Sequence, residues 1–133
     1  MDMSYRRCGR TTSKINYHLV FCTHYRRRIF QVAGVEARTQ ELARQICEQN
    51  DFILLEFDCQ ADYCHLYINV PPTTSAGEAV RIFKNGIAGA LLKEFPAFGK
   101  MRNLWTWDYF ATTSPRLNKA EVENFLRMQK TRS

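Results

Sequence analysis

The segment from Asp62 to Pro72 constrains the fold more than any other part of this chain, because it alternates strictly and then ends in two prolines. Successive side chains of a strand point to opposite faces of the sheet. One predicted face is apolar and carries Cys64, Leu66, Ile68 and Val70. The other is polar and aromatic and carries Tyr63, His65, Tyr67 and Asn69. We therefore predict a strand whose apolar face packs in the core. The polar and aromatic side chains of its other face require a structural or functional explanation, although a lone strand histidine is more often structural than a ligand.

The remaining apolar patterns predict three more strands and three helices. The expected strands are 15–22, 52–59 and 105–113, and the expected helices are 34–49, 75–94 (or from Thr73) and 118–130. Asn118 and Glu121 resemble a capping box for the last helix. The order β-α-β-β-α-β-α predicts the α+β class, with a ferredoxin-like antiparallel sheet, helices on one face and an additional C-terminal helix. A length of 133 residues predicts a single domain over 1–133, in which residues 1–13 form a basic arm.

The positive charge gathers at one end of the chain. The 19 basic and 13 acidic side chains give a net charge of +6. Residues 1–30 hold seven of the basic side chains against Asp2 alone, so the charges of the remaining residues cancel. A localised basic patch attracts a polyanion and releases its counterions. The pattern favours nucleic-acid binding over the alternative, a solvated tail that only confers solubility.

Targeting and redox features indicate the cytoplasm. The N-terminal residues lack the apolar segment of a secretory signal, and no apolar run is long enough to span a bilayer. The five cysteines are odd in number and scattered, which favours reduced, buried thiols over a disulfide framework. We expect a cytoplasmic protein without a membrane partner.

The last predicted helix carries one stripe of side chains at helical spacing. The stripe consists of Val122, Phe125, Leu126 and Gln129. Phe125 and Gln129 are one turn apart, so they can present their side chains to the same point. The alternative is an amphipathic helix that packs on the sheet with Gln129 at its edge.

Taken in order, these segments resemble the single-tyrosine HUH transposases of bacterial insertion sequences, the TnpA-type family. The resemblance runs over most of the chain. It is carried by 17–28 (YHLVFCTHYRRR), 62–72, Lys84, 94–96, Trp105, 109–110 and the closing helix. Each segment is weak by itself, and their order makes the resemblance specific.

The resemblance implies a metal-dependent chemistry on single-stranded DNA. In the family, two histidines and a helix side chain hold a divalent metal (Mg²⁺ or Mn²⁺), and a helix tyrosine attacks the scissile phosphate to form a 5′-phosphotyrosine link. Carried over by position, the second histidine is His65 and the helix ligand is Gln129, whereas Tyr63 stands at the first histidine and Phe125 at the nucleophile. Phenylalanine has no oxygen to attack with, and a neutral phenol is a poor ligand for a hard cation. We therefore expect a weak or absent metal and no strand cleavage.

The same resemblance implies dimers that recognise hairpins at the ends of the mobile element. We expect DNA contacts from Tyr25, Arg26, Arg27, Arg28, Arg81 and Lys84 and from Arg6, Arg7 and Arg10 of the arm. Trp105, Trp107 and Tyr109 are further candidates for stacking on bases, with core or dimer packing as the alternative for the tryptophans.

The predicted function is single-stranded or hairpin DNA recognition by a homodimer, in an accessory or regulatory role. Three alternatives stay open: an active transposase that uses a displaced tyrosine such as Tyr63, Tyr67 or Tyr109, an RNA-binding ferredoxin-like module, and a partner that forms mixed dimers with an intact paralogue.

Overall fold

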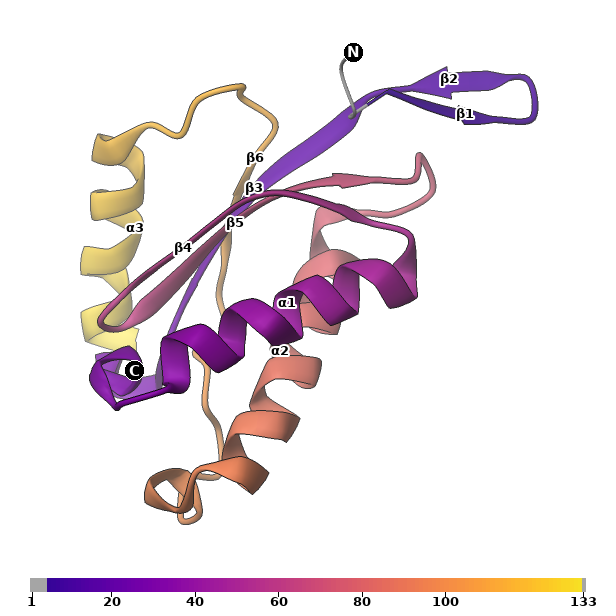
Figure 1. Cartoon of the computed structure of the whole chain (residues 1–133). Helices are drawn as coiled ribbons and strands as arrows, with labels where there is room; N and C mark the ends of the chain where they lie inside the picture. Colours follow the sequence, from indigo (N-terminus) through magenta and orange to yellow (C-terminus); the bar gives the residue numbers. More distant parts are fainter. Residues whose placement is uncertain (1–4, 133) are drawn as a thin grey trace.

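A computed structural model describes the backbone of residues 5–132 and the side chains of residues 5–129. Within them it forms a four-stranded sheet, a separate two-stranded hairpin and three α-helices (Figure 1). The strands are β1 (Arg6–Cys8), β2 (Thr11–Ser13), β3 (Ile15–Cys22), β4 (Ile53–Gln60), β5 (Tyr63–Val70) and β6 (Phe110–Thr112). The helices are α1 (Val35–Asn50), α2 (Ala76–Glu94) and α3 (Lys119–Arg132), with short 3-10 turns η1 (His24–Arg26), η2 (Ile29–Gln31) and η3 (Pro96–Phe98).

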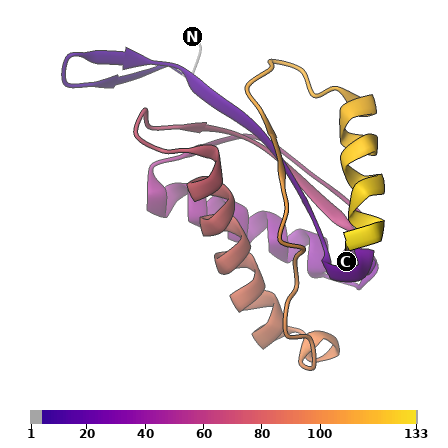
Figure 2. The same cartoon turned by 180° about the vertical axis from the view of Figure 1, so that it is seen from behind.

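The main sheet has the strand order β4-β5-β3-β6, and each neighbouring pair is antiparallel. Helices α1 and α2 lie on one face of the sheet, and α3 lies on the other, as Figures 1 and 2 show from opposite sides. The prediction of an α+β, ferredoxin-like sheet with an additional C-terminal helix is confirmed. Strand β5 begins at Tyr63 and ends at Val70, as its alternation predicted.

The alternation of β3 and β5 decides which side chains meet which helices. The apolar face of β5 packs with that of β3 and with the buried stripes of α1 and α2 in the main core. Its largest fully buried members are Phe21, Phe83, Leu19, Leu66, Ile68, Ile87, Leu91 and Leu104. A smaller cluster on the other face joins Val20 and Cys22 to Val122 and Leu126 of α3.

Helix ends are set by the residues that the sequence indicated. The Ser75 side chain accepts a hydrogen bond from the Glu78 backbone N–H at 3.1 Å, which starts α2. Asn118 accepts the Glu121 N–H in the same way at 3.2 Å, so that α3 begins where it was predicted.

The described part of the predicted arm is the hairpin β1–β2. It turns at Gly9, whose φ of 57° suits glycine, and it extends from the end of β3 (Figure 1). The hairpin is fixed to the main sheet through Arg6, whose guanidinium donates to Asn69 and pairs with Asp51 at 3.1 Å. Residues 1–4 of the predicted arm lie outside the described residues.

The predicted strand 105–113 is shorter than expected. Trp105 forms a single bridge to Thr23, and regular pairing resumes only over Phe110–Thr112. The Lys84 ammonium explains the interruption, because it donates to the backbone carbonyls of Thr106 and Asp108 at 2.7 and 3.0 Å. These hydrogen bonds tie the segment to α2 and leave Trp107 92% exposed.

Four of the five cysteines are buried free thiols, and Cys8 on the hairpin is exposed. Burial raises the pKa of Cys47 to about 12, so its thiol stays protonated at neutral pH. Across residues 5–132, no helix combines the length and the apolar character that a membrane crossing requires.

Candidate metal and nucleic-acid site

The sheet face beneath α3 gathers the polar side chains of three strands. Tyr63, His65 and Tyr67 of β5 share this face, as their alternation predicted. The register sets His18 of β3 opposite Tyr67. On the other side, Glu56 of β4 is also opposite Tyr67.

Two buried histidines are in direct contact at the centre of this face. His18 Nδ1 and His65 Nε2 are 2.8 Å apart, and His18 Nε2 lies 3.2 Å from the Pro115 carbonyl oxygen. A carbonyl only accepts, so the hydrogen bond to Pro115 requires the N–H of His18 to be on Nε2. The lone pair of a neutral His18 is then on Nδ1, where it accepts the N–H of His65 Nε2. The contacts therefore define the tautomer of both rings.

The surroundings favour the neutral form of His65 and restrict the motion of His18. Burial lowers the pKa of His65, and the nearby His18 lowers it further, against the opposing effect of the Glu56 and Asp58 carboxylates. The Tyr67 ring stacks on His18 with centroids 3.8 Å apart and planes 5° from parallel. The stacking restricts rotation of the His18 imidazole.

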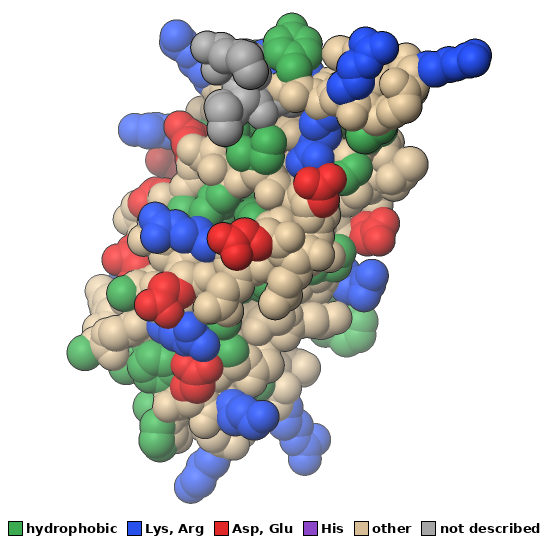
Figure 3. Space-filling model, turned by 45° about the vertical axis from the view of Figure 1, so that its right-hand side comes forward, with side chains coloured by type: hydrophobic (Ala, Val, Ile, Leu, Met, Phe, Trp, Pro, Cys, Tyr) green, Lys and Arg blue, Asp and Glu red, His purple; other side chains and the backbone are tan. Residues whose placement is uncertain are grey.

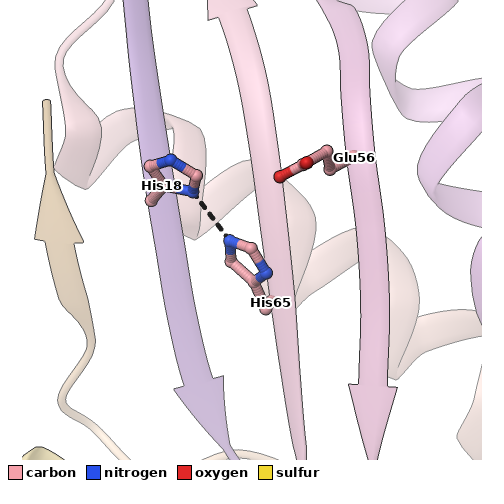
Figure 4. Close-up of side chains that lie close together, drawn as sticks. All are labelled: His18, Glu56 and His65. Carbon is pink, nitrogen blue, oxygen red and sulfur yellow. Dashed lines mark hydrogen bonds between the residues drawn. The ribbon is translucent and has the colours of Figure 1, made fainter. Parts of the chain in front are cut away.

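The exposed carboxylate of Glu56 completes a group of three ligands. Figure 4 shows Glu56 pointing from β4 toward the two histidines. One ligand atom from each residue fits within 4.8 Å of the others. Two imidazoles and a carboxylate are a common ligand set for divalent transition metals.

Tyr63 and His65 line one pocket, of about 450 Å³, between the sheet and the start of α3. Its other walls are Asp58, Gln60, Leu117, Lys119, Val122, Glu123 and Leu126. Burial raises the pKa of the Tyr63 phenol, with further increases from Asp58 and Asp62, so the phenol is neutral at pH 7.

Phe125 and Gln129 line a second pocket, of about 320 Å³, together with Trp107, Asp108, Tyr109 and Met128. The Phe125 ring is half-buried and lies 6.1 Å from Phe110, centroid to centroid. Gln129 is 2% exposed, and its Nε2 donates to the Asp108 carboxylate at 3.3 Å. The structure thus brings Tyr63 to His65 and Phe125 to Gln129, in two pockets that share no lining residue.

Three of the nine predicted DNA-contacting side chains are partly buried and form hydrogen bonds to other elements of the fold. Arg6 is docked on Asn69 as described above, and Lys84 holds the 106–108 backbone, where burial lowers its pKa to about 8. Arg26 pairs with Asp62 at 2.6 Å and donates to the Leu126 carbonyl at 3.3 Å. These three side chains hold neighbouring segments of the fold together, and Arg26 links η1 to α3.

The other six predicted contacts are exposed: Tyr25, Arg7, Arg10, Arg27, Arg28 and Arg81. The Arg27 guanidinium lies over the Tyr25 ring, 5.5 Å from its centroid. Tyr25 and Arg26 both have positive φ, at 58° and 52°, which is uncommon for side chains of this size. In Figure 3, basic side chains stand out at the hairpin end and again at the opposite end, and acidic and basic ones are mixed between them.

A larger groove, of about 680 Å³, runs between α2 and the segment 102–109. Arg81, Asn85, Arg102 and Asn103 supply polar groups, and Trp107 and Tyr109 line the same groove. The two aromatic residues are 92% and 40% exposed. Trp105 is different, because it is 7% exposed and packs edge-on against Phe21 at 4.9 Å, which is the core alternative named above.

Sequence reasoning missed His18 and Glu56. Each lies in a strand that was predicted, but alternation within one strand does not reveal the register between strands. Only the pairing of β3, β5 and β4 shows that both side chains come to His65.

Comparisons with known proteins give a consistent family assignment. Residues 11–129 match the family described as IS200-like transposases. The transposase of insertion sequence element IS200 from Salmonella typhimurium is 27% identical over 117 residues, which cover 85% of this chain and 75% of that protein. The ISDra2 transposase TnpA of Deinococcus radiodurans is 23% identical over 119 residues, covering 87% of this chain and 84% of that one.

Two solved structures share the fold. A crystal structure assigned to a transposase of Deinococcus radiodurans superposes with a TM-score of 0.85 at 24% identity, over 93% of this chain and 97% of that chain. A REP-associated tyrosine transposase bound to a REP hairpin superposes with a TM-score of 0.56 at 11% identity, over 90% and 66% respectively.

Proposed function

Because this chain belongs to the IS200-like transposase family, we propose that it recognises single-stranded or hairpin DNA without cutting it, as an accessory or regulatory factor in DNA transposition. The observation that carries this proposal is the benzene ring of Phe125, which stands beside Gln129 at the position where the family has its nucleophile. The protein acts in the cytoplasm as a homodimer.

Exposed side chains support the proposed binding of DNA. Arg7, Arg10, Arg27 and Arg28 are exposed cations, and unpaired bases can stack on Tyr25. The groove beside α2 combines Trp107 and Tyr109 with the guanidinium groups of Arg81 and Arg102. Hairpin binding is transferred from the REP-associated transposase, whose solved structure contains a hairpin.

The proposed lack of cleavage rests on three positions. A carbon–hydrogen ring edge cannot form a phosphoester, so Phe125 removes the covalent step. At the ligand positions of the family, Tyr63 contributes a neutral phenol, and Gln129 is engaged with Asp108 in a pocket separate from that of His65. An Mg²⁺ or Mn²⁺ ion would therefore be held weakly by Tyr63, His65 and Gln129.

One contact favours a second candidate function, an active enzyme with a displaced tyrosine. The Tyr67 ring stacks on His18, which in turn contacts His65, so a phenol does lie beside a group of metal-binding type. We rank this candidate second because Tyr67 lies in the middle of β5, where its ring is half-buried and stacked on His18.

Binding is tested by fluorescence anisotropy with a labelled DNA hairpin, its unpaired linear strand and an RNA copy of the hairpin. We expect the DNA hairpin or the unpaired strand to bind more tightly than the RNA copy. Tighter binding to RNA would instead support an RNA-binding module. Weak binding alone, with stable mixed dimers formed on addition of an intact relative, would support the mixed-dimer role.

The loss of cleavage is tested by restoration. The double variant Tyr63→His with Phe125→Tyr should nick single-stranded DNA in a metal-dependent way, and the single variant Phe125→Tyr is its matched control. If the double variant stays inactive, then the pocket differs from an active one at more than these two positions.

A further inference from the structure

We propose that His18, Glu56 and His65 form a binding site for a divalent transition-metal ion on the α3 face of the sheet. In this ligand set, His18 of the neighbouring strand β3 supplies the ligand that Tyr63 does not. The inference does not depend on DNA recognition, since it concerns the ligand atoms alone.

The separation of the two imidazoles suits adjacent ligands of one ion. Metal–nitrogen bonds to histidine are about 2.0–2.1 Å long, so two nitrogens at right angles around one ion are roughly 2.9 Å apart. His18 Nδ1 and His65 Nε2 are 2.8 Å apart in the structure. If both rings turn so that their lone pairs meet beside the line joining the two nitrogens, an ion of octahedral geometry can replace the shared proton.

The group behind His18 matches what a ligand requires. A metal-bound histidine usually donates its second ring N–H to a carbonyl or carboxylate, which orients the lone pair. His18 does this through Nε2, which lies 3.2 Å from the Pro115 carbonyl oxygen. Its Nδ1 is thereby left without a proton and faces His65 Nε2, and the Tyr67 ring stacks on His18.

Glu56 supplies a negative charge, and its exposed position gives an ion from solvent a route to the site. The two histidines are almost fully buried, whereas Glu56 is exposed at the side of β4. Its carboxylate can therefore turn onto an ion that enters from solvent, and it offsets part of the positive charge. His65 also lines the pocket that contains Asp58 and Gln60, so water has access to this ligand.

The ligand types select the class of metal. Imidazole nitrogens favour Zn²⁺, Co²⁺, Ni²⁺ and, less strongly, Mn²⁺, whereas Mg²⁺ prefers oxygen ligands throughout. We therefore assign the site to a transition-metal ion, and we expect Mg²⁺ to compete poorly for it.

The test is a titration of the untagged, EDTA-treated protein with Co²⁺, followed by its visible absorption and by calorimetry. We expect one ion per chain and at least tenfold weaker binding in Glu56→Gln, whose exposed side chain leaves the fold intact. The variants His18→Gln and His65→Gln should lose the spectrum. Circular dichroism of both variants shows whether they remain folded, and the Glu56→Gln result stands if they do not.

Two controls and one discriminating variant complete the design. His24→Gln removes the third histidine of the chain, and Glu48→Gln removes an exposed carboxylate of α1; both should bind Co²⁺ like the wild type. Gln129→Ala separates the two ligand sets, because it weakens binding only if the ion sits at the Tyr63–His65–Gln129 positions. Absence of stoichiometric binding, unchanged affinity in Glu56→Gln, or a loss in Gln129→Ala equal to that in His65→Gln would overturn the proposal.

Discussion

The two faces of the central sheet are built from the same strands and covered in opposite ways. Toward α1 and α2, the strands present an extended apolar surface that is buried to near completion. Toward α3, the buried apolar contact among the described side chains consists of Val20, Cys22, Val122 and Leu126, and buried His18, His65 and Gln129 lie on the same side of the molecule. Buried polar groups cost free energy unless they are well paired. The comparison assigns the stability of the fold mainly to the first face and its chemistry to the second.

The largest expected effect is a loss of stability on the α1–α2 face. Phe83 is fully buried, so Phe83→Ala should lower the free energy of unfolding by about 3–5 kcal/mol, measured by urea denaturation. Phe125→Ala is the matched control on the α3 face, and its half-buried ring should cost about 1–2 kcal/mol. An equal loss in the free energy of unfolding at both positions would contradict the larger contribution of the α1–α2 face to stability.

The next effect concerns binding alone. Trp107→Ala should weaken the affinity for single-stranded or hairpin DNA by about 1–3 kcal/mol, because base stacking on one aromatic ring has that magnitude. The urea midpoint should not change, since Trp107 is 92% exposed. Trp107→Phe retains a ring and should recover most of the affinity. A Trp107→Ala variant that binds DNA like the wild type would remove the groove beside α2 from the DNA contact surface.

A smaller effect on stability should distinguish the exposed side of α2 from the side that packs on α1. Gly89 has open space where a Cβ would be added, so Gly89→Ala should stabilise the helix by about 0.5–1 kcal/mol. At Gly86 the added Cβ would meet Ile46 Cδ1 at 2.7 Å and Cγ1 at 3.3 Å, so Gly86→Ala should lose this gain. Thermal unfolding of the two variants gives the comparison. A larger gain at Gly86 than at Gly89 would mean that α1 and α2 pack less closely than described.

The smallest effect is expected from Phe125→Tyr. The ring lines a pocket with Asp108 and Tyr109, where a hydroxyl can be solvated, so the free energy of unfolding should change by less than about 0.5 kcal/mol. Chemical denaturation measures it. A loss above about 2 kcal/mol would show that the hydroxyl is excluded for reasons of packing.

Local sequence patterns within single strands and helices were enough to predict most of the fold. The Asp62–Pro72 pattern predicted β5 to the residue, and Ser75 and Asn118 located the starts of α2 and α3. The segment 105–113 was harder, because a lysine from α2 takes the carbonyls of Thr106 and Asp108. That interaction joins residues more than 20 positions apart, and no local pattern contains it.

The candidate site could be predicted only where its residues belong to one element. The shared face of Tyr63 and His65 and the shared pocket of Phe125 and Gln129 follow from periods of two and 3.6 residues. The His18–His65 contact and the approach of Glu56 depend on strand register. The internal roles of Arg6, Arg26 and Lys84 depend on tertiary partners, so their charge alone suggested only a DNA contact.

The central claim, DNA recognition without cleavage, is tested most directly by intact-mass spectrometry of the wild-type protein after incubation with 3′-labelled single-stranded hairpin DNA and Mn²⁺. A 5′-phosphotyrosine link would retain the labelled fragment on the protein. Our account predicts a DNA complex that dissociates in denaturant and leaves the mass of the chain unchanged. A covalent adduct mapped to Tyr67, Tyr63 or any other tyrosine of the wild-type chain would contradict it.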